Sequence, residues 1–246
     1  MTSDQTIRIA MWSGPRNIST AMMRAFENRG DCAVWDEPFY APYLKATGLD
    51  HPMRDEIIAA HDSDPRSVAA TIGGPVPGGK LIWYQKHMNH HMIEGMPVGW
   101  ADHVVNCFLI REPEFVLASY AAKRAEVTLA DIGFVAQADM FNRLADKIGT
   151  PPPVVDSNLT LADPKGVLSM LCARIGIPFT ERMLAWPAGR RDSDGIWAKH
   201  WYGAVEASTG FGKPRLDLPD LPVSLARIAD AARPHYETMK RHALRR

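Results

Sequence analysis

Ile7-Arg8-Ile9-Ala10-Met11-Trp12-Ser13-Gly14-Pro15-Arg16-Asn17-Ile18-Ser19-Thr20 is the stretch that decides the predicted fold of this 246-residue sequence. It begins as an apolar, β-rich run and passes through a short turn into residues 18–26, whose apolar side chains have helical spacing. A strand, a turn and a helix in this order aim free backbone N–H groups and the positive end of the helix dipole at one point. The stretch therefore predicts an α/β fold with an anion-binding turn. The alternative is an ordinary strand-to-helix turn capped by Ser or Asn.

The same pattern continues along the chain. Further apolar runs at 33–35, 81–84, 103–110 and 154–155 predict strands, and helical periodicity at 134–149, 167–176 and 223–242 predicts helices. Strands that alternate with helices indicate a mostly parallel sheet covered on both faces. We therefore expect one domain, residues 1–246, with a three-layer α/β/α fold and a mostly parallel central sheet.

Two long segments fit no regular element. Residues 41–79 contain only short helical patterns and end in a Gly/Pro-rich turn, whereas residues 188–216 are rich in Gly, Arg, Lys, Trp and His. Long irregular segments inside a compact domain are often functional loops. We expect both segments to cover a substrate or cofactor.

Composition excludes several classes of protein. Lys plus Arg (28) balance Asp plus Glu (28), so the chain lacks the charge of a dedicated nucleic-acid or membrane-surface binder. No apolar stretch approaches the roughly 20 residues that span a bilayer. Cys32, Cys107 and Cys172 are widely separated, which favours buried thiols in a reducing compartment and a cytoplasmic location. The oligomeric state is left open.

Residues 108–120 carry the most specific signal in the chain. Arg111 ends a buried strand, at the position where open α/β sheets bind ligands, and Ser119 follows eight residues later on a predicted helix. The Arg111 fork offers paired hydrogen bonds to a phosphate, and Ser119 offers a third. The alternative is that Arg111 pairs with Glu112 or Glu114 and that Ser119 is a surface hydroxyl.

These two motifs, in this order, resemble the phosphate-binding motifs of sulfotransferases that use 3'-phosphoadenosine 5'-phosphosulfate (PAPS). The resemblance implies a P-loop nucleotide-binding-like fold and a bacterial cytosolic enzyme that moves a sulfuryl group from PAPS to a hydroxyl or amine of a small acceptor. It also implies that Arg111 and Ser119 bind the 3'-phosphate. In this sequence, the positions of the family's 5'-phosphosulfate loop are occupied by Arg16, Asn17, Ile18, Ser19 and Thr20. Ile18 stands where the family usually has glycine.

Sulfuryl transfer requires a base for the acceptor's proton and cations for the charge of the leaving phosphate. Glu37 follows the second predicted strand, in an Asp-Glu-Pro-Phe element that resembles bacterial sulfotransferases with a glutamate base. His87 follows the third predicted strand and resembles the Lys-x-His segment of cytosolic sulfotransferases, with the intervening residue missing. Lys86 is then expected to contact the transferring sulfonate. The sequence does not decide between Glu37 and His87.

Two later features complete the predicted site. Trp197 and Lys199 lie in a stretch that resembles the family's late Gly-x-Trp-Lys segment, which closes over the nucleotide. Trp197 would pack on the cofactor or on an acceptor and Lys199 would reach a phosphate, although Trp197 would equally well anchor the loop to the core. His87, His90 and His91 have spacing that places two ligands on one helix face, but no nearby Cys or matched carboxylate completes a set, so we expect no metal.

Two other functions remain open. A P-loop kinase that uses ATP would need a Lys followed by Ser or Thr at the end of the first loop, and residues 13–20 lack it. A non-catalytic nucleotide-binding protein on the same fold is the other alternative, because fold alone does not establish activity. The acceptor is not readable, and we expect residues 41–79 to shape its pocket.

Overall fold

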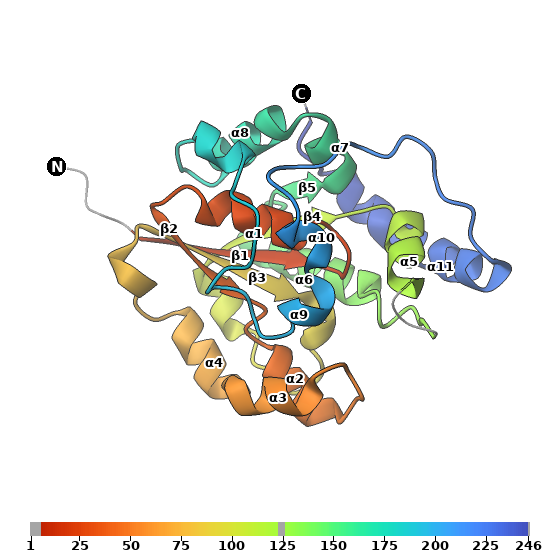
Figure 1. Ribbon diagram of the computed structural model, residues 1–246, viewed down its shortest axis with the longest axis horizontal. Coiled ribbons are helices and arrows are strands. Elements are labelled where there is room, and N and C mark those ends of the chain that lie inside the picture. The colour runs from red at the N-terminus through yellow and green to blue at the C-terminus, as the bar shows by residue number, and fades with distance from the viewer. Residues whose placement is uncertain (1–5, 123–125, 246) are drawn as a thin grey trace.

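A five-stranded parallel sheet forms the centre of the computed structural model, which describes residues 6–122 and 126–245 (Figure 1). Its strand order is β2-β3-β1-β4-β5, and every neighbouring pair is parallel. The strands are β1 (Ile7–Ser13), β2 (Cys32–Asp36), β3 (Ile82–Met88), β4 (Val105–Ile110) and β5 (Val154–Asp156). The sequence predicted a strand at each of these five places.

Helices cover both faces of this sheet because its central strand is apolar on both. In β1, Ile9 and Met11 belong to one buried cluster and Ala10 and Trp12 to the other, and all four are fully buried. The first cluster includes α1 (Ser19–Glu27) and α8 (Pro164–Arg174). The second includes α5 (Pro113–Ala121), α6 (Phe134–Ile148) and α11 (Val223–Lys240). The predicted three-layer α/β/α, P-loop-like fold is therefore confirmed.

The two irregular segments contain short helices. Residues 41–79 hold most of α2 (Tyr40–Thr47) together with α3 (Arg54–Ala60), α4 (Pro65–Ile72) and η1 (Pro77–Gly79), and Figure 1 shows α2, α3 and α4 on the side of the sheet away from α7 and α8. Residues 188–216 hold α9 (Ala198–Trp201) and α10 (Gly203–Glu206). The remaining short elements are η2 (Asn89–His91), η3 (Gly99–His103), α7 (Ser157–Ala162) and η4 (Glu181–Leu184).

The third strand is longer than predicted. The apolar run ends at Tyr84, but β3 continues to Met88 and is buried throughout. The prediction that His87 follows the strand was therefore wrong. Because side chains alternate between the two faces of a strand, Lys86 and His87 point to opposite faces of the sheet.

The environment of the three cysteines agrees with the prediction of buried thiols. Cys32, Cys107 and Cys172 are buried and free. Over residues 6–122 and 126–245, no helix combines the length and apolar character of a membrane-crossing segment.

Candidate active site

A cavity of about 500 Å³ lies at the carboxyl ends of the parallel strands, where open α/β sheets bind ligands. Its wall includes the turn after β1, the ends of β2 and β3, and the residue that follows β4. The predicted site residues that line it are Arg16, Asn17, Ile18, Ser19, Thr20, Glu37, Lys86, Arg111 and Ser119. His87, Trp197 and Lys199 are the predicted site residues that are absent from this wall.

The turn after β1 has a strained backbone and is arranged to bind an anion. Arg16 and Ile18 both have left-handed backbone, with φ of 63° and 57°, a conformation that costs a residue other than glycine about 1–2 kcal/mol and is a marked outlier for a β-branched side chain. Ile18 is the N-cap of α1 and has no side-chain oxygen, so the first N–H groups of the helix remain available to an anion. Glycine adopts this conformation freely, whereas Ile18 adopts it at a cost.

Asn17 fastens this turn to the body of the protein. Its Nδ2 donates to the Leu109 carbonyl oxygen at 3.0 Å, and its own carbonyl oxygen accepts from Ser157 Oγ at 3.0 Å. Asn17 is almost fully buried. Asn17 therefore anchors the loop to β4 through its side chain and to the start of α7 through its backbone carbonyl, and this anchoring fixes the backbone that surrounds the first turn of α1.

The two phosphate motifs meet directly although they are far apart in the sequence. Arg111 Nη1 donates to the Arg16 carbonyl oxygen at 2.7 Å, and Arg16 Nε donates to Ser119 Oγ at 2.8 Å. The two glutamates near Arg111 have partners on α11 instead: Glu114 pairs with Arg233, and Glu112 lies 3.6 Å from Lys240 Nζ. Arg111 therefore faces the phosphate loop.

Positive charge gathers at this end of the cavity. Burial, followed by the charges of Arg215 and Arg16, lowers the pKa of Arg111 to about 10, and burial also lowers the pKa of Arg16. Both guanidinium groups remain charged at neutral pH. Lys213 and Arg215 line the same cavity. Cations held close together in a partly buried cavity favour a ligand with several negative charges.

Lys213 and Arg215 were not predicted from the sequence as site residues. They lie inside the segment 188–216 that was expected to cover a ligand, but the resemblance drew attention to Trp197 and Lys199. A local sequence pattern could have indicated Lys213 and Arg215, because two basic residues follow a Gly-Phe-Gly run and glycines permit close backbone approach to an anion.

Glu37, Lys86 and Tyr202 line the cavity and belong to a buried charge cluster that also contains Asp36. Lys86 Nζ donates to Asp36 Oδ1 at 2.8 Å, to Glu37 Oε1 at 2.7 Å and to the Tyr202 hydroxyl at 2.5 Å. Burial raises the pKa of Glu37, and the charge of Lys86 opposes that rise. Burial alone would lower the pKa of Lys86, but the carboxylates of Asp36 and Glu37 more than offset it, so the pKa of Lys86 lies well above its usual value.

His87 is not brought to the cavity. Its ring stacks against Trp12 and Trp100, with centroid distances of 4.8 Å and 4.7 Å, and only 1% of the residue is exposed. Burial lowers its pKa to about 3. The physical reason is strand alternation: with one residue fewer after the lysine, the histidine falls on the opposite face of β3 from Lys86.

Other histidines do line the cavity. His91 lies between Tyr40 and Tyr43, at centroid distances of 4.7 Å and 4.8 Å, and its Nε2 is 4.0 Å from Glu37 Oε2. Burial lowers the pKa of His91 well below its usual value and the pKa of His90 to about 4, so both are neutral at physiological pH. Within the described ranges no group of three or more His, Cys, Asp or Glu side chains has the arrangement of a metal site.

In the late segment, Trp197 and Lys199 lie outside the wall of the cavity. Trp197 is 2% exposed and its Nε1 donates to the Tyr202 hydroxyl at 3.2 Å. Lys199 lies exposed on α9. Trp197 thus occupies the core, as in the alternative considered from the sequence, and Lys199 does not line the cavity.

Comparison with known proteins identifies the family. The family model for the sulfotransferase domain matches residues 7–243, so the chain belongs to the sulfotransferase domain family. Two curated relatives from Arabidopsis thaliana, branched-chain-amino-acid aminotransferase-like proteins 1 and 2, are 35% and 33% identical to it over 95% of this chain. The matched regions make up 42% and 41% of those proteins, so the chain spans about four-tenths of their length.

Solved structures agree on the fold. A sulfotransferase from Alicyclobacillus acidocaldarius superimposes with a TM-score of 0.55 at 10% identity, covering 97% of each chain. The sulfotransferase domain from the curacin biosynthetic pathway gives a TM-score of 0.50 at 15% identity, covering 92% of this chain and 97% of that one. At these identities the likeness concerns the fold alone.

Proposed function

We propose that the cavity binds PAPS and that the protein transfers its sulfuryl group to a hydroxyl or amine of a small acceptor. The observation that carries this proposal is the direct contact between the two anion motifs, through Arg111, Arg16 and Ser119. PAPS carries phosphate groups at two separate positions of one nucleoside. A site in which the start of α1 adjoins the corner between β4 and α5 suits such a ligand better than it suits one with a single phosphate chain.

The residues that are present fit the donor. Arg16, Ser19 and Thr20 would hold the 5'-phosphosulfate at the positive end of α1, and Arg111 with Ser119 would hold the 3'-phosphate. Arg111 Nε is buried and has no hydrogen-bond partner among the described residues, which is costly unless a ligand anion accepts from it. PAPS supplies the sulfuryl group: the acceptor atom bonds to sulfur, the bond from sulfur to the phosphate oxygen breaks, and adenosine 3',5'-bisphosphate is released.

We assign the base to Glu37. Its carboxylate lies at the cavity wall with a pKa raised by burial, toward the operating pH that favours proton transfer. When Glu37 takes the acceptor's proton it loses its charge, and the Lys86 N–H that it held becomes available to the charge developing on the leaving group. His87 is left out of this machinery because its ring is buried against Trp12 and Trp100 and does not line the cavity.

The acceptor end of the cavity has its own chemistry. Aromatic and imidazole rings line the cavity together with Glu37, and the charges of Asp36, Glu37 and Lys86 leave one negative charge in excess. Such a wall disfavours an anionic acceptor. The rings that line it are those of Tyr40, His51, His90, His91, Tyr120 and Trp201.

A transfer assay tests the function. The purified protein is incubated with ³⁵S-labelled PAPS and a panel of phenols, alcohols, sugars and amines, and labelled products are separated from donor. We expect transfer to at least one uncharged acceptor, and loss of that transfer in Glu37→Gln. Donor binding without turnover on any acceptor would support the non-catalytic nucleotide-binding protein instead. Phosphoryl transfer from γ-³²P-ATP to the same panel would support the kinase.

A further inference from the structure

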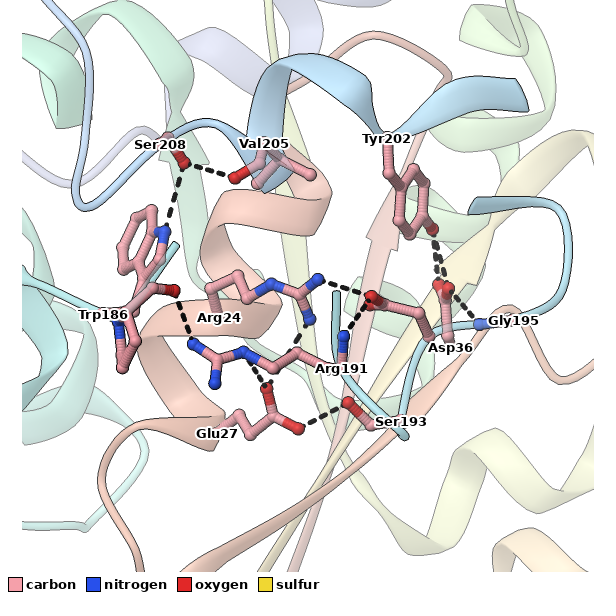
Figure 2. A network of polar contacts seen from close by, with 12 residues as sticks. Arg24, Glu27, Asp36, Trp186, Arg191, Ser193, Gly195, Tyr202, Val205 and Ser208 are labelled. Carbon is pink, nitrogen blue, oxygen red and sulfur yellow. Dashed lines mark hydrogen bonds and ion pairs between the residues drawn. The ribbon is translucent and has the colours of Figure 1, made fainter. Parts of the chain in front are cut away.

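Tyr202, which the sequence analysis did not single out, lies at the centre of the buried charge cluster. It occupies the junction of α9 and α10, is 5% exposed and lines the large cavity. Its hydroxyl donates to Asp36 Oδ2 at 2.7 Å and accepts from Lys86 Nζ at 2.5 Å. Figure 2 shows the ring pointing from its helix onto Asp36. The phenol oxygen therefore links the carboxylate to the ammonium group.

The ammonium group of Lys86 is saturated in this arrangement. A lysine side chain has three N–H donors, and the structure gives Lys86 three acceptors, on Asp36, Glu37 and Tyr202. The Tyr202 ring also faces the charge, with Nζ 4.9 Å from the ring centroid. Three acceptors in different directions fix the position of Nζ, and any change at one of them redistributes Lys86 between the other two.

The segment that carries Tyr202 is itself held from two sides. The Gly195 backbone N–H donates to Asp36 Oδ2 at 3.2 Å, and Arg24 Nη2 of α1 pairs with Asp194 Oδ2 at 2.7 Å with both side chains fully buried. Figure 2 shows Arg24 and Glu27 of α1 facing Arg191 and Ser193 of the same segment. Tyr202 is thus placed by contacts to the helix that follows the phosphate loop and to the end of β2.

We propose that Tyr202 is a positioning residue: with Asp36 it holds the Lys86 ammonium group against Glu37 and thereby sets how readily Glu37 takes a proton. The proposal rests on the proposed function, in which Glu37 is the base. Without the hydroxyl, Asp36 loses a donor and attracts Lys86 more strongly, so the contact between Lys86 and Glu37 weakens. That contact favours the charged form of Glu37, so its weakening raises the pKa of Glu37.

The groups around Glu37 make its titration sensitive to the position of the Lys86 ammonium group. The groups that face it are Asp36 from the end of β2, Lys86 from β3, His91 from η2, Tyr40 from α2 and Tyr202 from the junction of α9 and α10. Of these, Lys86 is the one that carries positive charge near neutral pH, since burial keeps His91 neutral. A shift in the Glu37 titration therefore measures how closely Lys86 approaches it.

The test is a pH titration of the glutamate side-chain carboxyl groups by ¹³C NMR in the full chain, with the Glu37 signal assigned by its loss in Glu37→Gln. In Tyr202→Phe we expect the Glu37 midpoint to rise by about 0.5 pH unit or more, and the acidic limb of kcat/KM to move with it. The matched control is Tyr236→Phe, which also removes a buried tyrosine hydroxyl from an aspartate, at 3.1 Å from Asp156 Oδ2. This control should leave the Glu37 midpoint in place.

A second variant predicts the opposite sign. Asp36→Asn removes one competitor for Lys86 and one like charge beside Glu37, so the Glu37 midpoint should fall. Folded Tyr202→Phe with a wild-type midpoint would overturn the proposal. If Tyr202→Phe does not fold, a midpoint in Asp36→Asn that is unchanged or raised would overturn it. Absence of sulfuryl transfer in the wild type would contradict the proposed function alone, because the carboxyl titration does not depend on turnover.

Discussion

At the scale of single residues, two positions beside the cavity share with Arg16 a backbone conformation that their side chains disfavour. Ile18 has φ of 57° at the start of α1, and Glu37 has φ of 42° at the end of β2. Such strain persists where the surrounding structure fixes the chain, and it concentrates at ligand-binding sites. One residue forms part of the proposed donor site and the other is the proposed base, so strain and proposed chemistry coincide.

Stability measurements on Ile18 test this strain. Ala is normally more favourable than Gly in a folded chain, but at a left-handed position Gly avoids about 1–2 kcal/mol and loses about 0.5–1 kcal/mol of chain entropy. We therefore expect Ile18→Gly to be more stable than Ile18→Ala, by up to about 1.5 kcal/mol in urea denaturation. Both variants lose the same side-chain packing to within one methyl group. A more stable Ile18→Ala would contradict the left-handed assignment.

The second residue-scale prediction concerns the base. Glu37→Gln should lower kcat by about 10²–10⁴-fold and leave the affinity for adenosine 3',5'-bisphosphate nearly unchanged. Burial raises the pKa of Glu37 above its ordinary value of 4.5, and only the deprotonated form accepts a proton. Activity should therefore decline as the pH falls through that raised pKa, and the acidic limb should lie above pH 4.5. A pH–rate profile checks this, and an active Glu37→Gln enzyme with the same limb would exclude Glu37.

At the scale of elements, the corner between β4 and α5 determines how the cavity recognises an anion. Arg111→Lys keeps the charge but loses the planar fork and the contact with the Arg16 carbonyl oxygen. We expect affinity for adenosine 3',5'-bisphosphate to fall about 10–100-fold and affinity for AMP to change little, by calorimetric titration. Arg143→Lys, at a half-exposed ion pair with Asp102, is the control that should leave both affinities unchanged. An equal loss of affinity for both nucleotides would show that Arg111 does not recognise the 3'-phosphate specifically.

The elements were largely predictable from local pattern. The apolar runs around Ile9 and Phe108 indicated buried parallel strands because strands covered on both faces are apolar throughout. Helix ends were marked by glycine, and Gly149 ends α6 in the left-handed conformation that the pattern implied. The end of β3 was missed because Gln85, Lys86 and His87 are polar yet buried. Lys86 is held there by Asp36 and Tyr202, which come from other parts of the chain.

The same reason explains what was missed in the candidate site. Tyr202 lies 116 residues from Lys86 along the chain, and nothing local to Tyr202 signals that its hydroxyl meets Lys86. Arg215 likewise reaches the cavity through the path of a loop without regular structure. A sequence motif can predict site residues that lie together on one backbone turn. Residues that are distant in the sequence and meet only after folding, such as Tyr202 and Arg215, are found only in the structure.

At the scale of the whole molecule, buried neutral histidines couple stability to pH. Burial lowers the pKa of His87 to about 3 and that of His90 to about 4, whereas in the unfolded chain both titrate near 6.5. Protons therefore bind the unfolded state first, and the stability that these groups contribute is present above pH 6.5 and is lost as the pH falls toward the folded values.

Urea denaturation at a series of pH values checks this coupling. Below pH 6.5 the free energy of unfolding should decline by up to about 1.4 kcal/mol per pH unit for each such histidine. His87→Gln should lower stability at neutral pH and reduce this slope. His200→Gln, at an exposed position on α9, should leave it unchanged. An identical slope in His87→Gln would show that His87 is not held neutral.

The central claim is that one cavity binds a nucleotide through phosphate groups at two separate positions. Calorimetric titration of the wild-type protein with adenosine 3',5'-bisphosphate, AMP and ATP tests it most directly. The account predicts binding of the bisphosphate at least about tenfold tighter than AMP and tighter than ATP, since each well-placed charged hydrogen bond contributes on the order of 1.5–3 kcal/mol. Equal affinity for the bisphosphate and AMP, or tighter binding of ATP, would contradict it.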